Sequence, residues 1–286
     1  MIVASLIEIY NAIRGSRVTF RTITPQHIAN DDIYVGNNAV VCRCVLPDSS
    51  HIALKCYASR RRNAHTIYGD SYIERELCLP TLAGRGYVDV ATLPWIEGTT
   101  LESYIKKPNT DYRTLSDSFD LMALEMLRSP WAHGDIKPDN VIITPSGDMK
   151  LIDFDAMWIP GFTDADAEEI GTPAFSHPLR DDRHFDKHID DFSIAMLSTM
   201  LAALALKREY FEPHITPDSS LFDPQSVIDG SDTLFTEAML LFERRDPSHY
   251  AIAHTLYGST GVIDGLDSVF EQAVNSHKNR IVVAKR

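Results

Sequence analysis

Residues 133–155, HGDIKPDNVIITPSGDMKLIDFD, decide the fold, because polar side chains at fixed positions flank two short apolar runs. The run at 141–144 (VIIT) is rich in β-branched residues, and the run at 149–152 (MKLI) is a second short apolar segment. Residues 145–148 (PSGD) between them are turn formers. The stretch therefore predicts a β-hairpin.

Three polar side chains stand at the ends of the predicted hairpin. Asp135 and Asn140 precede it, and Asp153 follows it directly. A hairpin brings its two ends together, so we expect these three side chains to converge. Two carboxylates and an amide oxygen form an oxygen-only ligand set, which suits Mg²⁺ rather than zinc.

The same stretch resembles the protein-kinase family, and in particular its bacterial-type Ser/Thr members. Residues 133–140 (HGDIKPDN) resemble the catalytic loop, and residues 153–155 (DFD) resemble the metal-binding Asp-Phe-Gly motif. Two positions depart from the family pattern. Gly134 stands where many kinases have Arg, which bears on regulation, and Asp155 stands where a Gly usually follows the Phe.

The resemblance implies a chemical role for four residues of this stretch. Asp135 would be the catalytic base, and Lys137 would place a positive charge on the transferring phosphoryl group. Asn140 and Asp153 would be the Mg²⁺ ligands. ATP and Mg²⁺ are the cofactors that these roles imply.

Residues 34–44 (YVGNNAVVCRC) occupy the place of the glycine-rich phosphate loop but keep a single glycine. The resemblance implies that Gly36, Asn37 and Asn38 lie against the phosphates. Backbone amides without a bulky side chain approach phosphate closely, and Asn tolerates some of the same conformations. A plain β-turn is the alternative interpretation.

The strand that follows resembles the Val-Ala-Ile-Lys motif in residues 52–55 (IALK). Lys55 would therefore hold the α- and β-phosphates, although a strand Lys is ordinarily a solvated edge residue. A helix is expected over residues 71–79 (SYIERELCL), and it offers two acidic partners for this Lys. Glu76 is the predicted partner, because apolar residues follow it at one and three positions, and Glu74 is the alternative.

Residues 88–93 (VDVATL) alternate in polarity and lead into residues 94–101 (PWIEGTTL), which resemble the hinge that binds adenine. Leu93 would be the gatekeeper. Pro94 lacks an N–H group, so the adenine contacts would come from its carbonyl and from the backbone of Ile96.

Later segments extend the resemblance. Residues 171–178 (GTPAFSHP) resemble the end of an activation segment, but Leu179 replaces the expected Glu, and no Arg follows residues 246–247 (DP). The two partners of an ion pair found in the family are thus both absent, so neither charge is left buried without its partner. Residues 190–193 (DDFS) begin an apolar helix, where Asp190 is expected to accept backbone amides of the catalytic loop.

The chain has 286 residues, of which 44% are hydrophobic, enough to bury a full core. The fold class expected is α+β, a two-lobed protein-kinase-like fold with a small β-rich N-lobe and a larger helical C-lobe. The domains expected are an N-terminal helix and strand extension at 1–33, an N-lobe at 34–97 and a C-lobe at 98–286. An amphipathic helix is expected at 2–13 and a buried one at 194–206, followed by a C-terminal helix and a basic tail.

The net charge of −13 disfavours nucleic acid and anionic membranes as partners, and the resemblance implies a protein substrate. The four cysteines show no CxxC pair, and Cys42 and Cys44 would be packing residues on one face of a strand. Together with the absence of a basic leader, this predicts a cytoplasmic protein. The oligomeric state is left open.

The function expected is therefore ATP-dependent phosphoryl transfer to a protein Ser or Thr hydroxyl. A small-molecule kinase of the aminoglycoside-phosphotransferase type shares the His-Gly-Asp sequence and the Asp-to-Asn spacing. A nucleotide-binding pseudokinase scaffold is the third alternative, and the single glycine of the phosphate loop is its main support.

Overall fold

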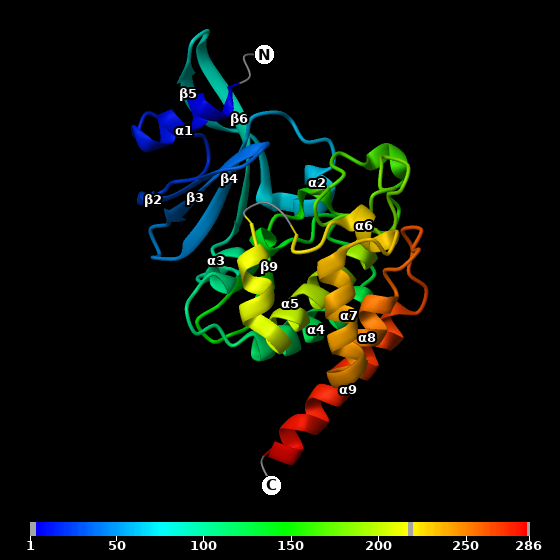
Figure 1. Ribbon diagram of the computed structural model, residues 1–286. Coiled ribbons are helices and arrows are strands. Elements are labelled where there is room, and N and C mark those ends of the chain that lie inside the picture. The colour runs from blue at the N-terminus through cyan, green and yellow to red at the C-terminus, as the bar shows by residue number, and fades with distance from the viewer. Residues whose placement is uncertain (1–3, 217–219, 285–286) are drawn as a thin grey trace. The chain divides into compact units, whose positions relative to one another are not determined.

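The computed structural model describes residues 4–216 and 220–284, with side chains up to residue 277. The chain divides into two compact units, residues 1–96 and 97–286, drawn in blue to cyan and in green to red in Figure 1. The first unit is built on an antiparallel sheet and the second is mainly helical, so the architecture is α+β as expected. The finer three-part division stays a prediction.

The sheet of the first unit has six antiparallel strands among the described residues, in the order β1-β5-β6-β4-β3-β2. Their bounds are Thr19–Phe20 (β1), His27–Val35 (β2), Ala39–Val45 (β3), His51–Tyr57 (β4), Tyr72–Thr81 (β5) and Gly84–Pro94 (β6). Cys42 and Cys44 alternate with less buried neighbours on β3 and are fully buried, which confirms them as packing residues.

Helix α1 covers this sheet and is fixed at its start by a capping box. It spans Leu6–Arg14, and the side chains of Ser5 and Glu8 bind each other's backbone N–H groups. Its residues Ile9 and Ile13 are buried in the core of the sheet. The helix predicted from residue 2 is confirmed from residue 6, and residues 2–3 lie outside the described ones.

The helix predicted over residues 71–79 is wrong, because this segment is part of strand β5. The described helical turns nearby precede it, at Ala64–Tyr68 (α2) and Gly69–Ser71 (η1). Leu77 and Leu79 are both fully buried, and their spacing of two residues is the strand period rather than the helix period. Arg75, with φ of 54°, lies where the pairing register between β5 and β6 shifts.

Glu76 is fully buried on β5 and anchors the segment that joins β1 to β2. Its carboxylate accepts hydrogen bonds from the Thr22 N–H (2.8 Å), the Thr22 hydroxyl (2.7 Å) and the Ile23 N–H (2.7 Å). Glu74 instead lies at the surface, where it pairs with Arg60 at 2.5 Å. The two carboxylates that the sequence presents as alternatives therefore differ in burial and in partners.

Removing the Glu76 carboxylate should destabilise the protein far more than removing that of Glu74. Glu76→Ala leaves three donors without their acceptor, and each buried unsatisfied group costs about 1–3 kcal/mol. The exposed pair of Glu74 contributes about 0–1 kcal/mol. Urea unfolding of Glu76→Ala, with Glu74→Ala as the matched control, measures the difference. Equal losses in the two variants would contradict the anchoring role.

The second unit contains helices and a small antiparallel sheet, ordered β7-β8-β9. The strands are Thr99–Thr100 (β7), Val141–Ile143 (β8) and Met149–Leu151 (β9). The α-helices are Leu101–Ile105 (α3), Tyr112–Arg128 (α4), Asp191–Phe211 (α5), Pro224–Ile228 (α6), Thr233–Arg245 (α7), Pro247–His254 (α8) and Leu266–Ala284 (α9). Short 3₁₀ turns lie at Pro138–Asn140 (η2), Phe154–Ala156 (η3), Asp164–Asp166 (η4) and Glu212–His214 (η5).

Helix α5 forms the centre of this unit. Nearly every residue from Asp191 to Leu204 is buried, as expected for a helix that is apolar on all sides. It packs against α4, α7 and α8, and α9 packs against α4 and α8 (Figure 1). The buried helix predicted at 194–206 and the C-terminal helix are both confirmed, whereas the side chains of the predicted basic tail lie outside the described residues.

No helix of the described residues combines the length and apolar character needed to cross a bilayer.

Candidate functional site

The hairpin predicted from the sequence is confirmed. Strands β8 and β9 pair antiparallel, and the Thr144 N–H donates to the Asp148 carbonyl at 2.9 Å across the turn. At the open end, the Ile152 N–H donates to the carbonyl of Asn140 at 3.0 Å. Asp153 follows Ile152 directly, so the backbone at Asn140 and at Asp153 is brought to the same end of the hairpin.

The carboxylate of Asp135 is held through one oxygen and open at the other. Its Oδ2 lies 3.0 Å from the amide nitrogen of Asn140 and 3.0 Å from the ammonium of Lys137. The same amide nitrogen also donates to the main-chain carbonyl of Asp135 at 2.8 Å. Its Oδ1 is buried and accepts no hydrogen bond from the described residues. One oxygen therefore fixes the carboxylate, and the other can accept a proton from a bound hydroxyl.

Asn140 and Asp153 carry side-chain oxygens of the kind that can ligate a cation. The Asn140 amide nitrogen donates to Asp135, so its amide oxygen is the atom that can ligate. Asp153 is exposed and adopts the left-handed conformation, with φ of 68° and ψ of 67°. The ring of Phe154, which follows it, packs on His133 with centroids 4.8 Å apart. This oxygen donor set fits Mg²⁺.

Lys137 links the loop at residues 133–140 to the segment at 171–178. Its ammonium lies between the Asp135 carboxylate and the hydroxyl of Thr172, to which it donates at 2.9 Å. The Lys137 side chain is 21% exposed, so its charge is partly shielded from water. A cation in this position can act on a negatively charged group that approaches Asp135.

Asp190 holds the backbone of the loop at residues 133–140, as predicted. Its buried carboxylate accepts short hydrogen bonds from the N–H groups of His133 (2.5 Å) and Gly134 (2.8 Å). Burial raises the pKa of Asp190, and these bonds together with the His133 ring oppose that rise. The His133 Nδ1 accepts from the Asp135 N–H, so its Nε2 donates to the Ile152 carbonyl at 2.9 Å.

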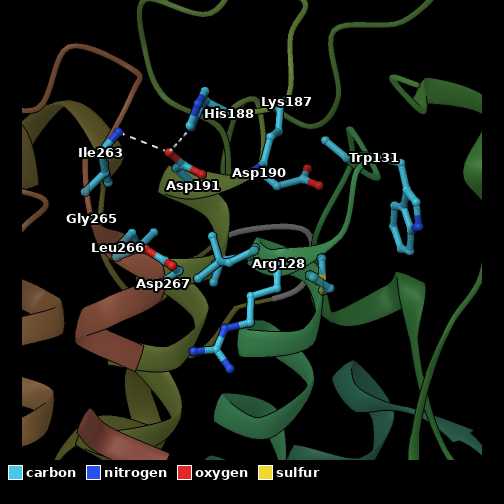
Figure 2. A pocket seen from close by; sticks show the side chains of 14 residues that line it. Arg128, Trp131, Lys187, His188, Asp190, Asp191, Ile263, Gly265, Leu266 and Asp267 are labelled. Atoms are coloured by element: carbon cyan, nitrogen blue, oxygen red, sulfur yellow. Dashed lines mark hydrogen bonds and ion pairs between the residues drawn. The ribbon is translucent and has the colours of Figure 1, made fainter. Parts of the chain in front are cut away.

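A pocket of about 330 Å³ is lined by residues of α4, α5 and the start of α9, and Asp190 is one of them. Figure 2 shows its lining, where the neighbouring Asp191 accepts from the Ile263 N–H and pairs with His188, each at 3.0 Å. Burial raises the pKa of Asp191 to about 6. Asp135 is not part of this lining, so the pocket is distinct from the site around Asp135.

The structure explains the glycine at position 134. Gly134 has φ of 86°, and a Cβ atom there would lie 1.9 Å from the carbonyl oxygen of Ala156. The backbone of η3 therefore passes too close to allow any side chain, including the Arg that many kinases carry. A glycine is required by this contact as well as by the left-handed backbone.

Arg180, for which the sequence predicts no role, lies near Gly134. A Cβ on Gly171 would be 2.6 Å from the Gly134 carbonyl and 3.0 Å from Arg180 Nη1. Both terminal nitrogens of Arg180 are buried without a hydrogen-bond partner among the described residues. Burial lowers its pKa, while the charges of Asp190 and Asp135 oppose that change. A cation from a different segment is thus present although position 134 has none.

Replacing Gly134 with Ala should disrupt the loop, whereas Gly147→Ala should be tolerated. Gly147 has a similar φ of 88°, but nothing lies within 4 Å of its added Cβ. Both variants carry the left-handed penalty of roughly 1–2 kcal/mol, and only the first also meets backbone atoms. Urea unfolding should show a clearly larger loss for Gly134→Ala. Equal midpoints for the two variants would contradict the close approach of Ala156.

The residues proposed for nucleotide binding lie in the first unit. Lys55 is 6% exposed on β4, between β3 and β6, so it is a buried residue of a central strand rather than a solvated edge residue. Its ammonium lies 5.5 Å from the ring centroid of Tyr57. The contacts of Glu76 and Glu74 described above involve other residues, so neither pairs with Lys55 in this structure.

The predicted phosphate loop is the turn of the β2–β3 hairpin. The Gly36 N–H donates to the Ala39 carbonyl at 2.9 Å, and the Ala58 N–H donates to the Asn38 carbonyl at 3.0 Å. Gly36 and Asn37 are exposed. A Cβ on Gly36 would lie 3.4 Å from the nearest described atom, so the turn itself does not require glycine.

The predicted hinge lies at the end of β6, which contains Leu93 and Pro94. The Trp95 N–H donates to the His51 carbonyl at 3.2 Å and is therefore used within the sheet. Ile96 follows as the last residue of the first unit. The roles of these residues toward adenine stay predictions.

Comparison with curated proteins finds similarity to a Ser/Thr kinase. Three curated proteins named serine/threonine-protein kinase PknK, from two strains of Mycobacterium tuberculosis and one of Mycobacterium bovis, match this chain at 30% identity over 167 residues. The match covers 52% of this chain, and the chain spans 15% of the relatives' own length. No protein-family model matches the chain. The similarity is to a Ser/Thr kinase and supports a kinase-like phosphotransferase.

Proposed function

We propose that this chain has a two-lobed kinase-like fold and transfers the γ-phosphoryl group of ATP to a Ser or Thr hydroxyl of a protein. The observation that carries the proposal is the Asp135 carboxylate, with Oδ2 held by Asn140 and Lys137 and a buried, open Oδ1. This arrangement supports a general base within reach of an acceptor hydroxyl.

In this mechanism Asp135 Oδ1 accepts a hydrogen bond from the acceptor hydroxyl and orients its oxygen for in-line attack. As the new P–O bond forms, the proton passes to this carboxylate and ADP leaves. Lys137 neutralises charge on the transferring group. Asn140 and Asp153 would hold Mg²⁺, which supplies positive charge to the phosphates when bound.

The first unit would bind the rest of the nucleotide. Lys55 is buried in a central strand and ends the residues that resemble the Val-Ala-Ile-Lys motif, so we assign it to the α- and β-phosphates. The remaining proposed nucleotide contacts are Gly36, Asn37, Asn38, Leu93, Pro94 and Ile96, while Glu76 is withdrawn as the partner of Lys55.

A protein acceptor is favoured over a small molecule by the bond between Lys137 and Thr172. It joins the catalytic loop to the segment at 171–178, which resembles the part of protein kinases that receives the substrate chain. The small-molecule kinase has no such observation in its favour. The pseudokinase alternative rests on the single glycine of the phosphate loop.

The variant Asp153→Asn should weaken Mg-ATP binding or turnover sharply, because the charged ligand of the metal is lost. Isothermal titration with ATP, in the presence and absence of Mg²⁺, measures it. The loss should be confined to the titration with Mg²⁺, and Asp148→Asn, in the turn of the hairpin, is the matched control. Tight binding of Mg-ATP that is indifferent to both Asp153→Asn and Lys55→Met would contradict the assignment.

The variant Asp135→Ala should lose phosphoryl transfer by about 10²–10⁴-fold, because the carboxylate that accepts the proton is removed. ATP binding should be retained, because the Asn140 amide keeps its bond to the main-chain carbonyl at position 135. Labelled γ-phosphate is followed to a generic basic protein, to aminoglycosides and to the chain itself. Transfer at the wild-type rate by the variant would refute the base assignment. Wild-type transfer to aminoglycosides alone would select the small-molecule kinase, and no transfer despite ATP binding would select the pseudokinase.

A further inference from the structure

A second cluster of chemically active side chains lies inside the helical unit and has no part in the proposed transfer reaction. It consists of Asp120 on α4, His249 on α8 and His277 on α9. Each side chain is buried, with at most 5% exposure, and one possible ligand atom of each lies within 4.8 Å of the others. Three helices distant in sequence thus place metal-binding groups at one point.

Distances within this cluster match those between ligands of one metal ion. Asp120 Oδ2 lies 3.0 Å from His249 Nε2 and 3.6 Å from His277 Nε2. A tetrahedral ion with bonds of about 2.0–2.1 Å holds its ligand atoms roughly 3.3–3.4 Å apart. The two observed distances lie on either side of this value, so small side-chain shifts suffice to accommodate an ion.

The outer nitrogen of each imidazole faces a different carboxylate. His249 Nδ1 lies 3.0 Å from Asp246 Oδ2, and His277 Nδ1 lies 3.3 Å from Asp117 Oδ1. Carboxylates are also found near the outer nitrogens of metal-bound histidines, where they orient the rings. Both Nε2 atoms lie near the same oxygen of Asp120.

We propose that Asp120 Oδ2, His249 Nε2 and His277 Nε2 bind one Zn²⁺ ion. Two imidazoles and one carboxylate form a donor set that suits zinc and not the hard cations Mg²⁺ and Ca²⁺. Ser116, whose buried hydroxyl lies 3.2 Å from His249 Nε2, borders the fourth position. Zinc bound here joins α4, α8 and α9 and therefore stabilises the docking of the C-terminal helix.

The test uses the full chain, produced with added zinc and dialysed against metal-free buffer. Elemental analysis should find about one zinc per chain in the wild type and a loss of most of it in His277→Gln. His177→Gln is the matched control, because His177 is another buried histidine, whose Nε2 contacts the Ser259 carbonyl outside the cluster. This control should retain the zinc, as should Asp153→Asn, which removes the proposed Mg²⁺ ligand.

A spectroscopic measurement on the wild type keeps the proposal testable if His277→Gln does not fold. Cobalt(II) in place of zinc should give the strong visible absorption of a four-coordinate site with nitrogen ligands, and one equivalent of zinc should abolish it. A weak spectrum typical of six oxygen ligands would overturn the proposal. Zinc well below one per chain in the wild type would overturn it too, as would full zinc content in His277→Gln or loss of zinc only in Asp153→Asn.

Discussion

The hydrogen bonds from the catalytic-loop backbone to Asp190 are the interaction on which the candidate site depends. A buried carboxylate is costly unless donors surround it, and the N–H groups of His133 and Gly134 supply them. Asp190 stands at the start of α5, the most completely buried helix of its unit. The loop that carries Asp135 is therefore attached to the start of a helix that is buried in the core.

The close approach of Ala156 to Gly134 is the second constraint, and it links the two halves of the proposed reaction. It brings the turn after Asp153 against the loop that carries Asp135, so the residues proposed to bind the metal and to accept the proton lie on segments in contact. The same contact excludes a side chain at position 134. A positive charge comes instead from Arg180, which follows Thr172 in the chain and whose terminal nitrogens are buried.

Local pattern was enough to predict the hairpin and the buried helix, because each depends on spacing within a short stretch. The role of Asp190 was predicted from the resemblance to kinases, since its partners at His133 and Gly134 are distant in sequence. The helix predicted at residues 71–79 came from the resemblance to kinases, and it is wrong because Leu77 and Leu79 follow the period of two of a strand. Glu76 was misassigned as a result, since its partners at Thr22 and Ile23 are distant in sequence. The cluster around His249 could not be predicted either, because only the packing of three helices brings its members together. The roles of the residues assigned to nucleotide binding stay predictions.

A crystal structure with Mg²⁺ and a non-hydrolysable ATP analogue tests the central claim most directly, because it locates the phosphates and the metal together. The account predicts a metal ion about 2.0–2.1 Å from an oxygen of Asn140 and from an oxygen of Asp153, bound to the phosphates of the analogue. It also predicts Asp135 Oδ1 facing the terminal phosphate with room for an acceptor hydroxyl between them. A bound nucleotide whose metal contacts neither Asn140 nor Asp153, or whose terminal phosphate lies away from Asp135, would contradict it.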